Sequence, residues 1–282
     1  MATVTINRGL RAGTLPDLPP NFFWTARKRP EDIKYLDSIR SAYGLTGTNS
    51  QTKLLTYDTY KIAKGEGLRI LNLSLAPHKL SGFNLCPSST KECRANCIGW
   101  HSGLNKFPDQ QKAKLWRTEF LYSNFSAFMR LLLAELNSTV RNHGPVALRL
   151  NTYSDLNWSP VSHLIWDAIG EHSISFEYTK RKEFVSGARP NWGKQFTHFA
   201  YSAKGRRFDD PEYLAGVVSR GHNVAIVCDR LPTGKTLFGR PWVNGDDNDR
   251  NVYLHSGKFI VLLPKGILNT SSDFVYTLKG NQ

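Results

Sequence analysis

The chain has 282 residues, a hydrophobic content of 40%, and 37 Lys and Arg against 23 Asp and Glu, for a net charge of +14. This composition is typical of a globular protein and excludes a disordered or fibrous one, and no run reaches the roughly 18 consecutive apolar residues of a membrane span. The positive charge favours nucleic acid as a partner; the alternative is a basic surface that only keeps the protein soluble. The N-terminus lacks the apolar segment of a secretory signal, so we expect a cytoplasmic protein without a membrane partner.

Residues 1–50 contain several prolines and little apolar periodicity, and we expect an N-terminal extension with one helix at 31–44. Residues 51–282 alternate short apolar strands with helices, which predicts one α/β domain with a parallel sheet. The helices are expected at 108–137, with a bend or break, at 159–172 and at 209–221. The strands are expected at 67–76, 146–151, 174–180, 196–203, 223–229 and 258–264.

Two arrangements fit six such strands: an open doubly wound sheet, or a (β/α) barrel. We prefer a six-stranded partial TIM-type barrel of parallel strands, because the polar residues follow the carboxyl ends of the strands and a barrel gathers those ends round one mouth. The residues expected at this mouth, on the same side as the cysteines, are Asn151, Asp155, Lys180, Arg181, Lys204 and Arg207.

Asp155 and Lys180 are the candidate catalytic residues at this mouth. A carboxylate at the end of a strand can act as a base, a metal ligand or a hydrogen-bond anchor. The alternative for this segment is that Asp155 or Asn157 caps the helix that begins near Ser159. Aromatic residues beside basic ones, as at Tyr178 and Tyr201, suit a nucleic-acid groove, and the alternative is a solvated basic rim.

Three of the four cysteines fall in the segment CPSSTKECRANC, residues 86–97, with the spacing C-x6-C-x3-C. Clustered thiols in a reduced compartment indicate a metal or redox site rather than disulfides. The spacing lacks the paired C-x2-C units of a zinc ribbon, and soft thiolates suit an iron–sulfur cluster. We therefore predict that Cys86, Cys93 and Cys97 bind a 4Fe–4S cluster. A Cys3His zinc site that includes His101 is the alternative.

Three cysteines leave one iron of such a cluster without a thiolate. Candidates for the fourth ligand are Cys228, His101 and His78. Cys228 ends an apolar strand, so it is also compatible with a buried free cysteine that packs as a small apolar residue.

A cysteine loop after the first strand of a barrel is similar to that of radical S-adenosylmethionine (SAM) enzymes. Their usual C-x3-C-x2-C spacing differs from the spacing here, and the glycine-rich turn expected after the second strand is replaced by RLNTYSDLNW. SAM is therefore a possible but unsupported cofactor. The turn GDDNDR at 245–250 lacks the closing Glu of a calcium loop, and we interpret it as an acidic turn held by Arg250.

Several ordered motifs in residues 51–282 resemble the gene product 88 family of phage proteins. They are LLTYDTYKIAKG, LSLAPHKLSGFNLCPSSTKECRANCIGWHSG, LRLNTYSDLNW, FEYTKR and VNGDDNDR followed by GKFIVLLPKG. The resemblance implies a phage origin, a cytoplasmic setting in the infected host, and a cysteine site at Cys86, Cys93 and Cys97. It carries no catalytic residue to this chain.

These observations predict a phage-encoded iron–sulfur protein. Its cluster is either structural or the centre of a redox or radical-type enzyme that acts on or near nucleic acid. The alternative is a non-enzymatic nucleic-acid-binding protein with a structural zinc or cluster site. The sequence leaves open whether the protein is an enzyme.

Overall fold

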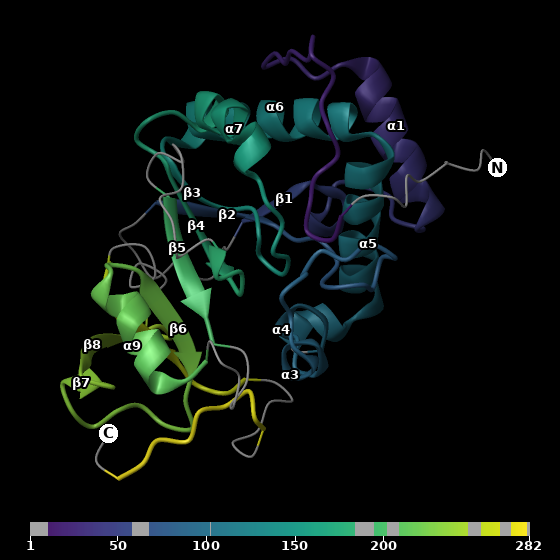
Figure 1. Cartoon of the computed structure of the whole chain (residues 1–282). Helices are drawn as coiled ribbons and strands as arrows, with labels where there is room; N and C mark the ends of the chain where they lie inside the picture. The colour runs from purple at the N-terminus through teal and green to yellow at the C-terminus, as the bar shows by residue number, and fades with distance from the viewer. Residues whose placement is uncertain are drawn as a thin grey trace.

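The computed structural model describes residues 11–57, 68–101, 103–183, 195–201, 209–247, 255–265 and 272–280, with the backbone alone at 195–199. The structure is of the α/β class, with helices packed against a long mixed sheet (Figure 1). In the described residues, no helix is long and apolar enough to cross a bilayer.

The sheet has nine strands among the described residues, in the order β1-β2-β3-β4-β5-β6-β9-β8-β7. Seven neighbouring strands, from β2 to β8 in this order, pair in parallel. Six of them, β2 to β6 and β9, match the six strand segments expected from the sequence, although β5 begins one residue before the expected segment. The bounds are β1 (Leu55–Tyr57), β2 (Arg69–Leu73), β3 (Val146–Arg149), β4 (Ile174–Thr179), β5 (Gln195–Ala200), β6 (Asn223–Val227), β7 (Thr236–Leu237), β8 (Arg240–Asn244) and β9 (Phe259–Leu262).

The expected TIM-type barrel, and with it the radical-SAM-like fold, is wrong, because the sheet is open. A barrel closes when its first and last strands pair. Here β1 pairs antiparallel with the outer edge of β2, and β8 pairs with the outer edge of β9. Both edges that would have to meet are therefore already hydrogen-bonded to other strands. The β7–β8 pair is antiparallel, so the sheet is mixed rather than all parallel.

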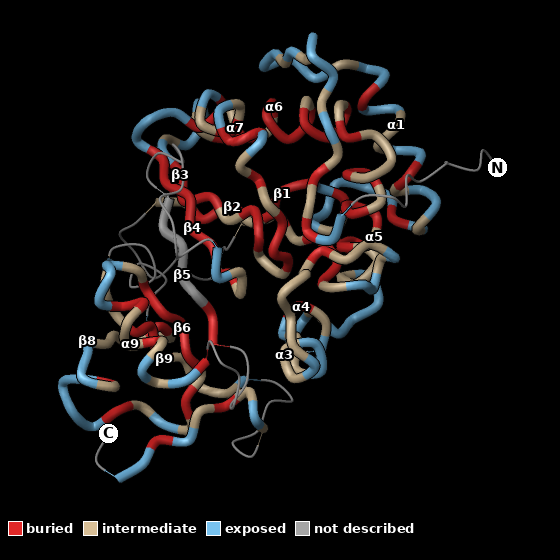
Figure 2. The backbone as a smooth tube through the Cα atoms, viewed as in Figure 1, coloured by how far each residue is buried: buried red, intermediate tan, exposed pale blue. Residues whose placement is uncertain are grey.

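The two faces of the sheet differ in what they pack against. Alternate residues such as Leu71 and Leu148 join the helices in the largest core cluster, and Val224 and Phe259 join the last helix in a second cluster. On the opposite, inner face a small cluster collects side chains from both ends of the parallel set, from Ile70 of β2 to Ile260 of β9. Strands β2, β3, β4, β6 and β9 are buried along most of their length (Figure 2). The open sheet therefore curves around its inner face, with the crossover helices outside.

Helices cover the outer face, and their ends follow simple capping signals. The expected helix at 108–137 is two helices, α5 (Pro108–Ser123) and α6 (Phe125–His143), and the chain turns sharply between them (Figure 1). Asn124 causes the break: its extended backbone ends α5, and its side chain accepts a hydrogen bond from the Ala127 N–H to cap α6. The other helices and 3-10 turns are α1 (Pro30–Ala42), η1 (Ser50–Thr52), α3 (Lys91–Ala95), α4 (Ile98–His101), η2 (Gly103–Lys106), η3 (Ser159–Val161), α7 (Ser162–Ile169) and α9 (Pro211–Ser219).

The segment expected to be an N-terminal extension packs on the domain from residue 11 onward. Leu15 and Ile39 are buried in the largest core cluster, and the Arg130 guanidinium of α6 binds both oxygens of the buried Asp32 carboxylate at 2.6 and 2.7 Å. The expected division at residue 50 stays a prediction, but the described N-terminal residues contribute core.

Candidate functional site

A pocket of about 310 Å³ lies at the carboxyl ends of the parallel strands. This edge of an α/β sheet is where ligands usually bind, and the pocket volume is at the lower end of the range for small-molecule sites. Each of the seven parallel strands contributes residues at or near its carboxyl end, and those from β8 are Gly245 and Asp246. The residues from the six strands expected from the sequence are Pro77 and His78, Arg149 and Asn151–Asp155, Tyr178 and Lys180, Ala200 and Tyr201, Ala225 and Val227, and Leu262, Leu263 and Lys265.

All three clustered cysteines line this pocket: Cys86, Cys93 and Cys97. The loop is built locally, since Thr90 caps the short helix α3 by accepting a hydrogen bond from the Cys93 N–H at 3.0 Å. Each thiol is partly buried and none is in a disulfide. The structure therefore brings together the three thiols that the sequence singled out.

The cysteine thiols are hydrogen-bonded and desolvated. The His78 N–H donates to Cys86 Sγ at 3.3 Å, and the Cys86 thiol faces the Tyr153 carbonyl at 3.5 Å. Burial raises the pKa of Cys86 to about 12 and that of Cys97 to about 11. Without a bound cation, these thiols keep their protons at neutral pH, and metal binding would release them.

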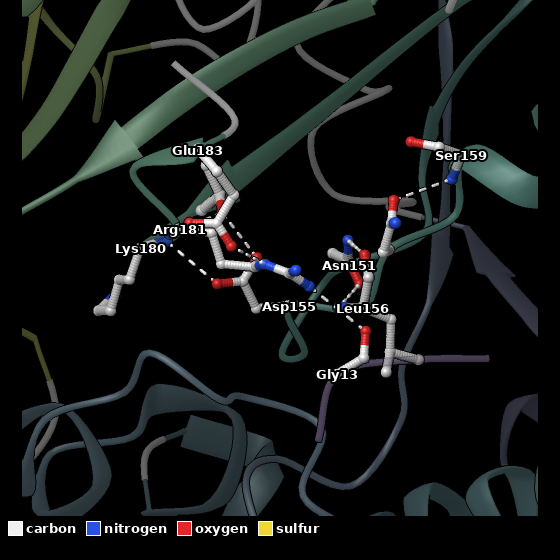
Figure 3. A network of polar contacts seen from close by, with 10 residues as sticks. Gly13, Asn151, Asp155, Leu156, Ser159, Lys180, Arg181 and Glu183 are labelled. Carbon is white, nitrogen blue, oxygen red and sulfur yellow. Dashed lines mark hydrogen bonds and ion pairs between the residues drawn. The ribbon is translucent and has the colours of Figure 1, made fainter. Parts of the chain in front are cut away.

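Asp155 lies at the pocket and does not cap the following helix. Its carboxylate accepts hydrogen bonds from the Thr179 hydroxyl at 2.7 Å and the Lys180 N–H at 3.1 Å (Figure 3). Burial raises the pKa of this carboxyl to about 6. Asn157 does not cap it either: its side chain accepts from the Ser159 N–H at 3.1 Å in the turn before η3, while the N-cap positions of η3 and α7 are Trp158 and Val161.

The polar network around Asp155 ties three segments together (Figure 3). The Asp155 N–H donates to the Leu85 carbonyl beside the first cysteine, and the Asn157 N–H donates to the Gly13 carbonyl. Gly13 has φ +74°, and a Cβ there would lie 2.6 Å from Pro87. The N-terminal segment, the cysteine loop and the loop after β3 therefore form one wall.

Lys180 lines the pocket, whereas its neighbour Arg181 is absent from the lining. Burial alone lowers the pKa of the Lys180 ammonium, but the nearby Cys93, Asp155 and Cys86 outweigh it and the pKa is raised overall. Arg181 instead binds Glu183 at 2.9 Å and approaches the Gly13 carbonyl at 3.4 Å (Figure 3). Asn151 is buried at the pocket, where it donates to Glu177 at 2.5 Å.

Two proposed fourth ligands are absent from the pocket lining. Cys228 is fully buried in the second core cluster, where burial raises its pKa to about 12, and His101 is exposed at the end of α4. Of the three candidates only His78 lines the pocket. Lys204, Arg207 and Arg250 lie outside the described residues.

Sequence reasoning did not single out Arg149, which lines the pocket, and did not place Asp246, whose carboxylate pairs with Lys265, at the site. A signal for Arg149 was present, because it is a lone cation at the end of the apolar strand VALR. A cation there breaks the apolar pattern of a buried strand. The sequence predicts that Arg250 holds the acidic turn at 245–250. In the described residues the Asp246 carboxylate of this turn pairs with Lys265.

The fold and pocket define an α/β protein with a cysteine-bearing site at the carboxyl edge of its sheet. The chain belongs to the gene product 88 family of phage proteins, whose sequence profile matches residues 43–277. That span includes every described residue of the pocket lining. No curated protein and no solved structure shows significant similarity to the chain.

Proposed function

We propose that this pocket is the functional centre of the protein and that Cys86, Cys93 and Cys97 hold a 4Fe–4S cluster there. The observation that carries the proposal is the convergence of three thiols, none of them in a disulfide, on one pocket formed by the ends of the parallel strands. Soft thiolate donors are the ligands that iron–sulfur clusters require.

The preference for a cluster over zinc comes from the chemistry of the donors. Among the described residues, no three His, Cys, Asp or Glu side chains are grouped as ligands of one metal ion. The three thiols lack the paired C-x2-C units of a zinc ribbon, and three soft thiolates are typical ligands of an iron–sulfur cluster.

The surroundings of the thiols suit an anionic centre. Backbone N–H groups of His78 and Gly99 donate to Cys86 and Cys97, and the ammonium of Lys180 interacts with Cys93 and Cys86. Hydrogen bonds to cluster sulfurs and nearby positive charge raise the reduction potential. Such a cluster supplies one-electron transfer, or an open iron that accepts a substrate atom.

The residues of the chain define what else the site can do. Asp155, with a pKa raised to about 6 by burial, can accept or release a proton near neutral pH. Lys180 holds a positive charge beside it. Radical chemistry was expected only from the similarity to barrel enzymes. Because the sheet is open, we do not propose it.

Anaerobic purification followed by absorbance, iron and sulfide analysis tests the cluster. The protein is expected to be brown, to absorb broadly near about 400 nm, and to lose this colour in Cys86→Ala, Cys93→Ala or Cys97→Ala. Cys228→Ala is the matched control, because its thiol is buried in the second core cluster, and it should keep the colour. Stoichiometric zinc without iron would overturn the proposal.

A second candidate function is non-enzymatic binding of nucleic acid, with the cysteines as a structural zinc or cluster site. The net charge of +14 favours it. The test is binding to single- and double-stranded DNA and RNA at several salt concentrations. A contact that neutralises phosphates gives an affinity that falls steeply and linearly on a log–log plot. Affinity that does not depend on salt argues against it.

A further inference from the structure

Arg149 occupies an unusual place at the end of β3. Its neighbour two residues earlier, Ala147, belongs to the inner-face cluster, so alternation along the strand places Arg149 on the same face. The guanidinium lies 4.9 Å from the Tyr178 ring centre and 5.8 Å from that of Phe176. Arg149 also lines the pocket. It is thus a cation held by two aromatic rings at the inner side of the site.

The hydrogen-bonding capacity of this guanidinium is largely unused. It has five N–H donors, and in the described part of the chain its one hydrogen bond is from Nη2 to the Thr152 carbonyl at 3.4 Å. Its Nε is buried without any acceptor, and no ion pair to Arg149 is present among the described residues. A buried donor without an acceptor is unfavourable, so a ligand in the pocket that supplies an acceptor would be stabilised by Arg149.

The remainder of the pocket points to the same kind of ligand. The pocket is lined by two carboxylates, of Asp155 and Asp246, and by four cationic side chains: Arg94, Arg149, Lys180 and Lys265. Asp246 is already paired with Lys265. The Lys180 ammonium forms no ion pair or hydrogen bond among the described side chains and lies 5.8 Å from the Phe274 ring. Two unpaired cations, on neighbouring strands, therefore face one cavity.

Most of the remaining lining is apolar or aromatic, beside the polar side chains of Ser89, Asn96, Asn151, Thr152 and Ser154. The apolar and aromatic residues are Pro77, Ile98, Tyr153, Tyr178, Ala200, Tyr201, Ala225, Val227, Leu262, Leu263 and Phe274. A ligand that matches this lining needs an anionic group at one end and an apolar, preferably planar, body. The pocket volume of about 310 Å³ restricts it to a small molecule.

We propose that the pocket binds a small organic oxyanion, a carboxylate or a phosphate monoester with a planar apolar body, and that Arg149 is the residue that holds the oxyanion. The planar fork of a guanidinium matches two oxygens of either group. The wall formed by Tyr178, Tyr201 and Phe274 takes the body. This assignment goes beyond the proposed cluster and does not require it.

Titration calorimetry with small aromatic probes tests the assignment. Benzoate and phenyl phosphate share a ring and differ in the oxyanion, so the tighter of the two identifies which group the site prefers; benzamide is the neutral counterpart of benzoate. At least one oxyanion probe is expected to bind saturably at millimolar concentration or below, and benzamide at least tenfold more weakly. Arg149→Met should weaken the preferred probe by about tenfold or more, since hydrogen bonds to charged groups are worth that much.

Three controls make the result decisive. Arg141→Met removes the same charge from an exposed position on α6, and it should bind the probe as the wild type does. Arg149→Lys keeps the charge but loses the fork, so it should also weaken binding; it serves for the comparison if Arg149→Met does not fold. Cys86→Ala, which removes a proposed cluster ligand, should retain probe binding and thereby separates this proposal from that of the cluster.

Four outcomes would overturn the assignment. They are the absence of saturable binding of either oxyanion probe to the wild type, equal affinity for benzamide and the oxyanions, equal weakening by Arg149→Met and Arg141→Met, and loss of probe binding in Cys86→Ala with the fold intact. The last of these would mean that the metal centre, not Arg149, holds the oxyanion.

Discussion

Two regions of the molecule bury positively charged side chains, and they differ in how many hydrogen-bond acceptors these side chains have. On α5, the Arg117 side chain is 2% exposed and donates to the carbonyls of Lys53 and Ser50 at 2.8 Å each, and the Lys114 ammonium donates to the Gln110 carbonyl at 3.1 Å. In the pocket, Arg149 and Lys180 lack comparable partners among the described residues. Arg117 connects α5 to residues 50–53 and Lys114 binds a carbonyl of its own helix, whereas the pocket cations are available to a ligand. The predictions below separate these two uses.

The largest effect is expected for Arg117→Met. The change removes two short hydrogen bonds from a charged donor and leaves the Lys53 and Ser50 carbonyls without it. We expect the free energy of unfolding to fall by about 3–4 kcal/mol, measured by urea denaturation at unchanged m-value. Arg141→Met on the surface should stay within about 0.5 kcal/mol of the wild type. Similar losses in both variants would mean that Arg117 has no structural role.

A pH-dependent effect is expected from Lys114. Burial lowers the pKa of its ammonium to about 8 in the folded chain, against about 10.4 when unfolded. Between these values the unfolded state binds more protons, so this residue makes the free energy of unfolding rise with pH from about 8 to 10.4. Below pH 8 both states are protonated at Lys114, so its effect on stability no longer changes with pH. The rise amounts to at most about 3 kcal/mol.

The difference between wild type and Lys114→Met isolates this contribution from other groups that titrate in the same range. We expect Lys114→Met to be the more stable protein at pH 7, because it removes a desolvated charge, and the difference to shrink as the pH rises to 10. The measurement is the urea midpoint of both proteins at several pH values. Parallel curves would show that Lys114 is not desolvated.

A smaller effect is expected where the cysteine loop meets the loop after β3. A Cβ at Gly99 would lie 2.4 Å from the Tyr153 ring. Gly99→Ala should therefore lower the free energy of unfolding by about 1–3 kcal/mol. Because the change displaces Cys97, it should also weaken retention of the proposed cluster. Gly216→Ala is the matched control: Gly216 is inside α9, where a Cβ makes only an ordinary contact at 3.6 Å, and the change should stabilise by about 0.5–1 kcal/mol. If Gly99→Ala leaves the free energy of unfolding unchanged, the Tyr153 ring can move away from residue 99 without cost.

The smallest stability effect is expected for Arg149→Met, in direct contrast to Arg117→Met. Removing a buried donor that has no acceptor eliminates a penalty instead of creating one. We expect the urea midpoint to shift by the equivalent of less than about 1 kcal/mol, toward higher stability. A loss as large as that of Arg117→Met would mean that Arg149 is a structural cation, which would erase the distinction between the two regions.

The convergence of the candidate site could be predicted from the sequence. Cys86, Cys93, Cys97, Asn151, Asp155 and Lys180 all line one pocket. The physical basis is that parallel strands present their carboxyl ends at one edge, so polar residues after successive strands meet there whether the sheet is closed or open. A closed barrel is therefore not required to bring these residues together.

Directions of individual side chains could not be predicted in the same way. Arg181 follows β4 as Lys180 does, yet it binds Glu183 and the Gly13 carbonyl instead of lining the pocket. Cys228 ends β6, yet it lies in the outer cluster with α9. Successive residues of a strand face opposite sides, and only the packed structure shows which parity faces the cavity.

The sequence by itself determined six of the parallel strand segments, the α/β class and the gathering of the cysteine loop with the strand ends, because these follow from local periodicity and chain connectivity. Only the tertiary structure decided that the sheet stays open. That outcome depends on β1 and β8 pairing with the outer edges of β2 and β9, and neither strand was expected from the sequence. It also decided that Arg149 has no acceptor while Arg117 has two. Whether a buried cation is satisfied depends on which carbonyls the fold brings to it, and therefore on packing rather than on sequence.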